Sequence, residues 1–481
     1  MPLRQSAGNS HPPFSRRAGV DQPMRRMNPV SARLMLFVSM AVLAVQPATA
    51  QSILRDSETE KLFNDMSRPL IEAAQLDPKN VKIVMVNDPE INAFVAGGQI
   101  VYIHSGLITS ADNANQVQGV IAHELGHVVG GHVIRFGEGA KQATGISIIS
   151  LVLGGLAMAA GAGEAAMGAM ALGQQVAMGS FLAFTRAQET SADLAGVSYL
   201  SKAGISGQGS IQFFKKLQNQ EYRLAVYATD SYNRTHPLSS ERVATLTDLY
   251  KKDPAWNRPT DPALEARFQR VRAKLIGFIS DKEAVLRTYP PSDQSVPAHY
   301  ARAYAYHRMG DRDAALREAD ALLATAPNDP FYLELKGQIL LESGKPMEAL
   351  EPLRMAVRKA PDQPMIQAML GHALLATEKN ENLPEAERVL RASIGRDNEQ
   401  PFAWYQLGVI YDRKGDLPRA SLATAERYSL EGQPKLALAN AERALKGIPQ
   451  GTPDFLRAQD IAMVSRTEVE KDRKGRGRRE Q

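Results

Sequence analysis

A 34-residue period constrains the second half of this 481-residue chain more than any other feature. Small residues and prolines recur at this spacing between residues 298 and 450: Ala303, Gly337 and Gly371; Gly310 and Gly344; Ala315 and Ala349; Pro327 and Pro361; Ala386 and Ala420. A fixed period of this length is typical of stacked units that bury their apolar faces only against neighbouring units. We therefore expect residues 298–450 to form a repeat solenoid.

Each repeat has the composition of two antiparallel helices. Small residues lie where the helices would touch, and large residues fill the space beside them. The unit WYQLGVIYDRKGD (Trp404–Asp416) combines Trp, Leu-Gly, Tyr and Gly at offsets that resemble tetratricopeptide repeats. The resemblance implies an all-α solenoid with a concave face for a partner peptide. We expect a helical linker at 254–297, and a disordered basic tail at 451–481 because the last residues lack an apolar face.

The first fifty residues have the pattern of an export signal. They contain six arginines and one acid, and an apolar run from Leu34 to Val45 precedes the small residues Ala48-Thr49-Ala50. This predicts that residues 1–50 are a signal peptide cleaved after Ala50, with translation starting at Met24 or Met27. The rest of the chain has 51 basic and 51 acidic residues, which argues against nucleic-acid binding.

The stretch VIAHELGHVVGGH (Val120–His132) carries the candidate chemistry. The chain has no cysteine, so thiol catalysis, disulfides and cysteine-ligated zinc are excluded. His123 and His127 are spaced i, i+4, which places both imidazoles on one face of a helix. Two neutral imidazoles suit Zn²⁺, and Glu124 beside them can act as a general base on water. We predict one catalytic zinc ion per chain.

A zinc site of this kind needs a third protein ligand, and two patterns supply one. In the pattern HExxHxxGxxH the third histidine would stand at Val133, whereas this chain has His132, turned by about 100° on a helix. The alternative is a glutamate from a second helix. FTRAQETSADLAG (Phe184–Gly196) provides Glu189 as the ligand and, four residues later, Asp193 to orient a zinc histidine. We favour this second arrangement.

The segment 139–179 between these motifs is rich in Gly, Ala and Met. One interpretation is a pair of tightly packed buried helices or a mobile or membrane-contacting lid over the site, and the other is insertion into a membrane. We favour the first, because Glu164 interrupts the apolar run. A membrane-embedded protease would need several long apolar spans, and this sequence lacks them.

The region before the motif mixes helix and strand patterns. Apolar spacing predicts a helix over Glu58–Leu76, and VKIVMVN (Val81–Asn87) predicts a strand. Gly97-Gly98 between two β-rich runs predicts a hairpin, and Ser110 is the expected N-cap of the motif helix. Residues 51–253 are therefore expected to form an α+β, mostly helical domain with a small edge sheet.

Three motifs in order resemble a known family. HELGH, RAQETSAD and THPLSSERV (Thr235–Val243) resemble the gluzincin zinc peptidases related to HtpX and the CAAX prenyl proteases. The resemblance implies that His123, His127 and Glu189 bind zinc and that Glu124 is the catalytic base. It also places His236 near the metal, as an oxyanion contact or as a fourth ligand that silences the enzyme. Arg242 is expected to pair with an acid near the site.

The same resemblance implies an edge strand beside the cleft. It maps onto INAF, with Asn92, Ala93 and Phe94 as the residues that would hold a substrate as an added β-strand. The alternative, a buried hairpin with no binding role, stays open. An added strand is held through its backbone, so this mode suits unfolded chains of many sequences.

The resemblance extends to periplasmic members that carry repeats and act in outer-membrane protein quality control. It implies an endopeptidase whose substrates are unfolded or immature outer-membrane proteins and whose repeats bind the β-barrel assembly machinery. A peripheral contact with the membrane stays open. The alternative function is a non-proteolytic chaperone or adaptor that works through its repeats.

Overall fold

The computed structural model describes residues 53–133, 135, 141, 144, 146–152, 163–224, 236 and 239–477, with side chains for all of these except 163–166, 169, 220–224 and 474–477. The predicted signal peptide lies outside the described residues. None of the helices in the described part of the chain combines the length and the hydropathy needed to cross a bilayer.

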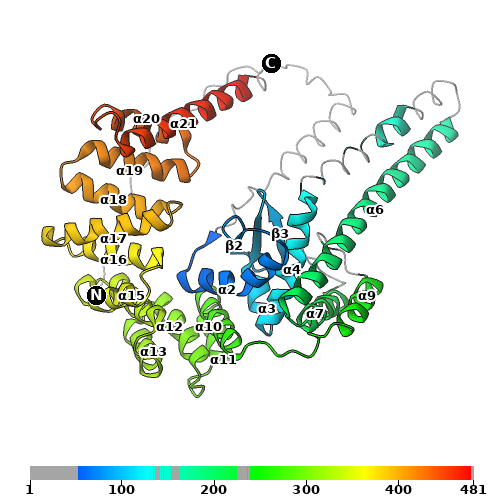
Figure 1. Cartoon of the computed structure of the whole chain (residues 1–481), viewed down its shortest axis with the longest axis horizontal. Helices are drawn as coiled ribbons and strands as arrows, with labels where there is room; N and C mark the ends of the chain where they lie inside the picture. The colour runs from blue at the N-terminus through cyan, green and yellow to red at the C-terminus, as the bar shows by residue number, and fades with distance from the viewer. Residues whose placement is uncertain are drawn as a thin grey trace, which may run out of the picture. The chain divides into compact units, whose positions relative to one another are not determined.

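A small sheet begins the described chain (Figure 1). Its strands are β1 (Ile53–Leu54), β2 (Lys82–Val86), β3 (Ala93–Ala96) and β4 (Ile100–His104), in the order β1-β2-β4-β3. β2 and β4 run parallel, and the β3–β4 pair is the predicted hairpin, with Gly97 and Gly98 at positive φ in its turn. β3 is therefore an edge strand, as expected for residues that could pair with a substrate.

The helices that form one core with this sheet include α2 (Ser57–Ala73), α4 (Ala114–Gly130), α7 (Gln208–Leu224) and α10 (Pro262–Ile279). The expected helix and strand patterns at 58–76 and 81–87 are confirmed as α2 and β2. The prediction that Ser110 caps the motif helix is wrong. Ser110 ends the short helix α3 (Ser105–Ser110), and Asn113 caps α4 by accepting a hydrogen bond from the Gln116 amide at 3.0 Å.

The long helix α6 (Gly163–Ala203) packs closely against α4, while α9 (Ser240–Lys251) contacts α7. A Cβ on Gly126 of α4 would come within 2.6 Å of the Ala192 carbonyl oxygen of α6. Gly196 of α6 likewise faces the backbone of Ala122 and His123. The small residues in both motifs thus allow the two helices to approach, which brings their side chains into one site.

The N-terminal half of α6 differs from the expectation for segment 139–179. It extends away from the sheet (Figure 1), and its apolar side chains are exposed, as are those of the helical segment 146–152. The expectation of a buried helix pair is therefore wrong for the described part of this segment. The reason is that the domain core is completed by other helices, and nothing in the described chain covers this one.

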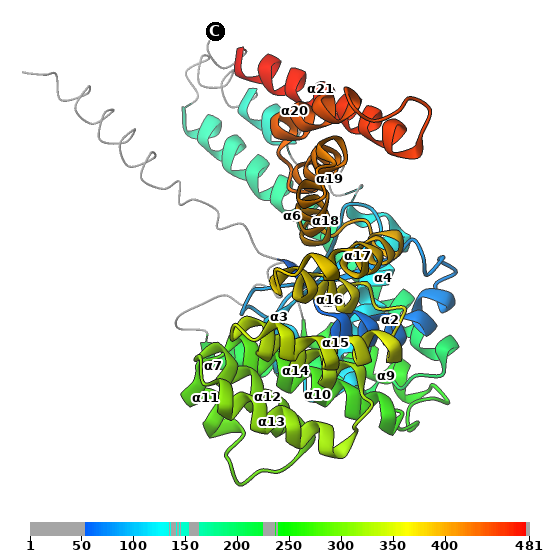
Figure 2. The same cartoon turned by 90° about the vertical axis from the view of Figure 1, so that its left-hand side faces the viewer.

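The repeat region is all helical (Figure 2). Its helices follow the short α11 (Lys282–Thr288), and each packs against the next along the chain. They are α12 (Val296–Arg308), α13 (Arg312–Thr325), α14 (Pro330–Glu342), α15 (Pro346–Lys359), α16 (Pro364–Ala376), α17 (Leu383–Arg396), α18 (Pro401–Arg413), α19 (Leu417–Leu430) and α20 (Pro434–Leu445). A Cβ on Gly337 would come within 2.4 Å of Leu353, and one on Gly371 within 2.5 Å of Leu390. The period therefore places small residues at helix contacts, as predicted.

The C-terminal segment is also helical. The prediction of a disordered tail at 451–481 is wrong for most of it, because Pro453–Gly477 form α21. Ala458, Ile461 and Ala462 of α21 are buried against α19 and α20. These residues recur at helical spacing and cover the apolar face that the last repeat would expose, so α21 caps the solenoid.

A buried charged cluster joins the N-terminal domain to the repeats. Glu58 of α2 pairs with Arg270 of α10 and accepts a hydrogen bond from the Tyr300 hydroxyl of α12 at 2.5 Å. Lys274 of α10 pairs with Asp56. The helix α10, predicted as part of a linker, therefore packs into the domain core on one side and holds the first repeats on the other.

Candidate metal centre

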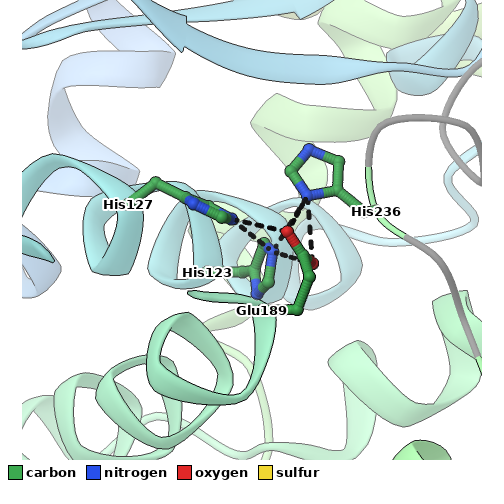
Figure 3. A group of neighbouring side chains, drawn as sticks. All are labelled: His123, His127, Glu189 and His236. Carbon is green, nitrogen blue, oxygen red and sulfur yellow. Dashed lines mark hydrogen bonds and ion pairs between the residues drawn. The ribbon is translucent and has the colours of Figure 1, made fainter. Parts of the chain in front are cut away.

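Four side chains from separate parts of the chain converge at one point (Figure 3). His123 and His127 come from α4, Glu189 from α6 and His236 from the stretch before α9, and all four are buried. His127 Nε2 lies 3.1 Å from His123 Nε2, and His236 Nδ1 lies 3.3 Å from the same atom. The i, i+4 spacing on α4 therefore does place both imidazoles together, as predicted.

The Glu189 carboxylate completes the group. Its oxygens lie 3.4 Å from His123 Nε2, 3.3 Å from His127 Nε2 and 3.1 Å from His236 Nδ1. Four ligands at about 2.0–2.1 Å from a tetrahedral zinc ion are separated from one another by roughly 3.3 Å. The three nitrogens and the carboxylate therefore have both the chemistry and the spacing of a tetrahedral zinc site.

The contacts within the group also shift the pKa values of its members. Burial opposes charge on His123, but contacts with Asp193 and Glu189 raise its pKa to about 10. Burial would raise the pKa of Glu189, yet its contacts with His123, His127 and His236 hold that pKa well below its usual range. Glu189 is thus an anion within a buried cluster, where a bound metal ion would offset its charge.

Asp193 and Arg242 surround the converging atoms. Asp193 Oδ1 lies 3.0 Å from His123 Nδ1, the nitrogen that points away from the cluster. Arg242 pairs with Asp193 through two nitrogens, and its Nη2 lies 3.0 Å from Glu189 Oε2. The structure therefore places Asp193 where a partner of His123 was predicted, and it pairs Arg242 with two acids of the site.

His132, whose position in the motif makes it an unsuitable metal ligand, is nevertheless a neighbour of the site. It lies outside the converging group, and its Nδ1 lies 2.9 Å from His127 Nδ1. Gly131, at φ 62°, ends α4 and turns the chain back, and a Cβ on Gly130 would come within 2.3 Å of the His132 ring. Burial lowers the pKa of His132 to about 4, so its ring is neutral. If His127 binds a metal through Nε2, its Nδ1 carries the proton and donates it to His132 Nδ1. In the sequence, the Gly-Gly pair before His132 was the one signal that the chain could turn back here and bring His132 onto the site.

Glu124 lies beside the converging atoms and is fully buried. Among the residues that the structure describes, none donates a hydrogen bond to either of its carboxylate oxygens, and His236 Nε2 lies 3.6 Å from Oε1. Burying a carboxylate without hydrogen bonds is costly, so such groups are usually retained for a function. This position suits a base that takes a proton from water at the site.

The edge strand β3 reaches the same site. Asn92 O accepts a hydrogen bond from His104 N of β4, so the next carbonyl, that of Ala93, points to the outer edge of the sheet. His236 Nε2 lies 3.3 Å from this Ala93 oxygen. Phe94 stacks on Tyr102 with ring centroids 5.1 Å apart. Of the predicted strand residues, Ala93 thus contacts the site, while Asn92 and Phe94 hold the strand to β4.

Comparisons with known proteins agree with this arrangement. Residues 55–250 match the family described as "Peptidase family M48", and residues 300–364 and 369–435 match "Tetratricopeptide repeat". The chain is 25% identical over 409 residues to the "Beta-barrel assembly-enhancing protease" of Escherichia coli (strain K12). The aligned residues make up 83% of this chain and 81% of that protein. It is 28% identical to the "Mitochondrial metalloendopeptidase OMA1" of Saccharomyces cerevisiae, over 38% of this chain and 51% of that protein.

A further relative decides the family. The "Metalloprotease LoiP" of Escherichia coli (strain K12) is 30% identical to this chain over 201 residues, which are 41% of this chain and 73% of LoiP. The buried His and Glu cluster lies within the matched residues 55–250. The chain therefore belongs to peptidase family M48, as a metalloendopeptidase followed by tetratricopeptide repeats.

Proposed function

We propose that this chain is a periplasmic zinc endopeptidase of outer-membrane protein quality control. In this proposal it cleaves misfolded or stalled outer-membrane proteins and assists their assembly. The observation that carries the proposal is the convergence of His123, His127 and Glu189 beside the buried, unbonded carboxylate of Glu124. The similarity to a protein named for β-barrel assembly, which extends over 83% of this chain, supports the location and the substrate class.

In the proposed site, His123, His127 and Glu189 hold one zinc ion per chain, with Asp193 fixing the orientation of His123. When bound, zinc would supply Lewis-acid activation of water and of the scissile carbonyl. Glu124 takes the proton from the attacking water on a carboxylate oxygen and later delivers it to the nitrogen of the leaving amine. Arg242 balances the charge of Glu189 and Asp193, which keeps both acids ionised.

The substrate strand is proposed to add to β3. The Ala93 carbonyl points outward and lies next to the site, so a strand bound there would pass the converging atoms. Such binding reads the backbone and tolerates many sequences, as a quality-control protease requires. The proposed recognition of the β-barrel assembly machinery is assigned to the repeats, whose matched segments belong to a peptide-binding solenoid class.

His236 has two candidate roles. Its Nδ1 lies among the converging atoms, which supports a fourth ligand that silences the enzyme until it is displaced. Its Nε2 near Glu124 equally supports a contact to the transition state once the ring has turned. The first role also favours the second candidate function, a chaperone or adaptor that holds clients without cleaving them.

One experiment tests the proposal. The purified full-length protein, Glu124→Gln, His236→Ala and the surface control Glu241→Gln are compared for bound zinc and for cleavage of an unfolded outer-membrane protein. We expect about one zinc per chain in all four proteins, because His123, His127 and Glu189 are present in each. Glu124→Gln should lose cleavage by at least about 10²-fold relative to the parent, and Glu241→Gln should cleave like the parent. Faster cleavage by His236→Ala supports the silencing role, and slower cleavage supports the transition-state role.

Two results would contradict this function. If the parent protein contained no metal, the proposal that this site binds zinc would be wrong. Retention of bound clients with no cleavage by the parent or by His236→Ala would favour the adaptor.

A further inference from the structure

A helical projection outside the metal centre exposes an unusual amount of apolar surface. It consists of the helical segment 146–152 and the half of α6 before Arg186, which touch where a Cβ on Gly173 would meet the Ser150 side chain. Nine of its large apolar side chains are between 42% and 69% exposed, namely Ile148, Ile149, Leu151, Val152, Met167, Leu172, Val176, Met178 and Leu182. Figure 1 shows this half of α6 extending beyond the rest of its domain.

The exposed apolar side chains of α6 do not form a single stripe. Met167 and Val176 are nine residues apart, which is two and a half turns, so they point to opposite sides of the helix. Leu172 and Leu182 extend the apolar surface along the same stretch. A helix that docks on a protein is apolar on one face, whereas a helix that is apolar around most of its circumference is surrounded by apolar material.

The distribution of charge also distinguishes this projection. From residue 142 to residue 185 the sequence has one charged residue, Glu164. Exposed basic residues flank this stretch, with Arg135 and Lys141 before it, separated by Glu138, and Arg186 after it. An apolar stretch with a single acid and with basic residues on both flanks is complementary to a bilayer whose headgroups are anionic.

We infer that this projection docks the protein on the surface of an anionic lipid bilayer. It enters the interfacial layer and does not cross the bilayer, since the exposed Gln174 and Gln175 interrupt its apolar surface. Because α6 continues without a break to Glu189, docking would set the height of the metal centre. The helix from Leu172 to Glu189 spans roughly 25 Å, so the site would face chains that lie close to the membrane.

Vesicle flotation of the purified full-length protein tests the inference. The vesicles contain either phosphatidylethanolamine with phosphatidylglycerol or phosphatidylcholine alone. The triple variant Met167→Gln, Leu172→Gln, Val176→Gln is compared with a repeat-region triple of similarly exposed apolar residues in the repeats and their capping helix α21, Met309→Gln, Leu417→Gln, Met463→Gln. Circular dichroism checks that both variants fold. Cleavage of a soluble peptide checks that the metal centre is intact.

We expect the parent and the repeat-region triple to float with the anionic vesicles, and the projection triple to bind at least about tenfold less. Lys141→Gln with Arg186→Gln should weaken binding to anionic vesicles only. The inference is overturned if the parent does not bind vesicles or if the projection triple binds as well as the parent. It is also overturned if the projection triple changes only self-association, or only the capture of an unfolded polypeptide, since the surface would then serve a second copy or a client.

Discussion

At the scale of single residues, the histidines of the candidate metal centre make contacts on both sides of their rings. His123 contacts Asp193 through one ring nitrogen and the converging group through the other, and His127 does the same with His132. Fixing the far nitrogen of a histidine sets its tautomer and its ring orientation. His132 is therefore a positioning residue for His127, although it lies outside the converging group.

The first residue-scale prediction concerns His132. His132→Ala should weaken zinc binding by about 10–100-fold, because His127 loses the acceptor that orients it. The measurement is a competition titration with a chromophoric chelator, and His132→Gln, which can still accept a hydrogen bond, should recover part of the affinity. Equal affinities in His132→Ala and the parent would assign His132 to packing alone. His372→Ala in the repeats is the control.

The second residue-scale prediction concerns Glu334, a buried residue of α14 that lies near the charged residues Lys274 and Glu58. Burial raises its pKa to about 8, and Asp56 and Glu58 add to the effect against Lys274. The folded protein thus holds a proton here between pH 4.5 and about 8, whereas the unfolded chain releases it near 4.5. The contribution of Glu334 to stability is full below pH 4.5 and is lost as the pH rises to about 8.

Glu334→Gln should remove this pH dependence, because the amide resembles the protonated acid. The parent should lose up to a few kcal/mol of unfolding free energy between pH 5 and pH 8 relative to the variant. Urea unfolding at both pH values measures it, with the exposed Glu348→Gln as the control. A difference between parent and variant that does not change with pH would contradict the prediction.

At the scale of elements, the approach of α4 to α6 decides the geometry of the site. The helices carry His123, Glu124 and His127 on one side and Glu189 and Asp193 on the other. Gly126 lies one residue before His127, and its missing side chain admits the backbone of Ala192. The glycine within HELGH thus has a packing role.

The element-scale prediction follows from this contact. Gly126→Ala should separate α4 from α6, because the added Cβ would lie 2.6–3.1 Å from the Ala192 backbone. We expect lower stability by about 1–3 kcal/mol and weaker zinc binding. Gly168→Ala on α6, where a Cβ meets nothing within 4 Å, should leave zinc binding unchanged. Thermal unfolding and metal titration of both variants measure this, and unchanged zinc affinity in Gly126→Ala would contradict it.

At the scale of the whole described chain, two kinds of contact join the catalytic domain to the repeats. One is the cluster around Glu58 and Arg270, in which Tyr300 donates a hydrogen bond to Glu58 and Arg270 pairs with Asp329. The other is a pair of exposed contacts, Arg55 with Asp397 at 2.7 Å and Lys82 with Glu399 at 2.6 Å. These contacts span a groove of about 1380 Å³ between β1, β2 and α2 on one side and α14, α16 and α18 on the other.

The two kinds of contact should differ in strength. Glu58→Ala leaves Arg270 and Tyr300 without their buried partner and should cost about 3–5 kcal/mol. Glu399→Ala removes one exposed pair and should cost less than about 1 kcal/mol, with sensitivity to salt. Denaturant unfolding of both variants measures this. A cost for Glu58→Ala as small as that for Glu399→Ala would show that the domains are not joined through the buried cluster.

What the sequence determines by itself is local or periodic. The i, i+4 spacing of His123 and His127 places both rings together in any helix, and the 34-residue period predicts the repeat helices, because both depend only on residues near in sequence. The helix α2, the strand β2 and the hairpin followed from local patterns for the same reason. Glu189 was predicted from the need of zinc for a third ligand and from the acidic motif of a second helix, whereas the position of His236 came from the family resemblance, since no local rule relates it to α4.

The tertiary structure alone decides which surfaces meet. It turns His132 back onto His127 after Gly131, aims the Ala93 carbonyl at His236, and folds the basic end of the chain into α21 over the last repeat. It also leaves the apolar projection on α6 uncovered. Each of these outcomes depends on whether another element is close enough to bury a given face. That is a property of the packed molecule, which no window of the sequence contains.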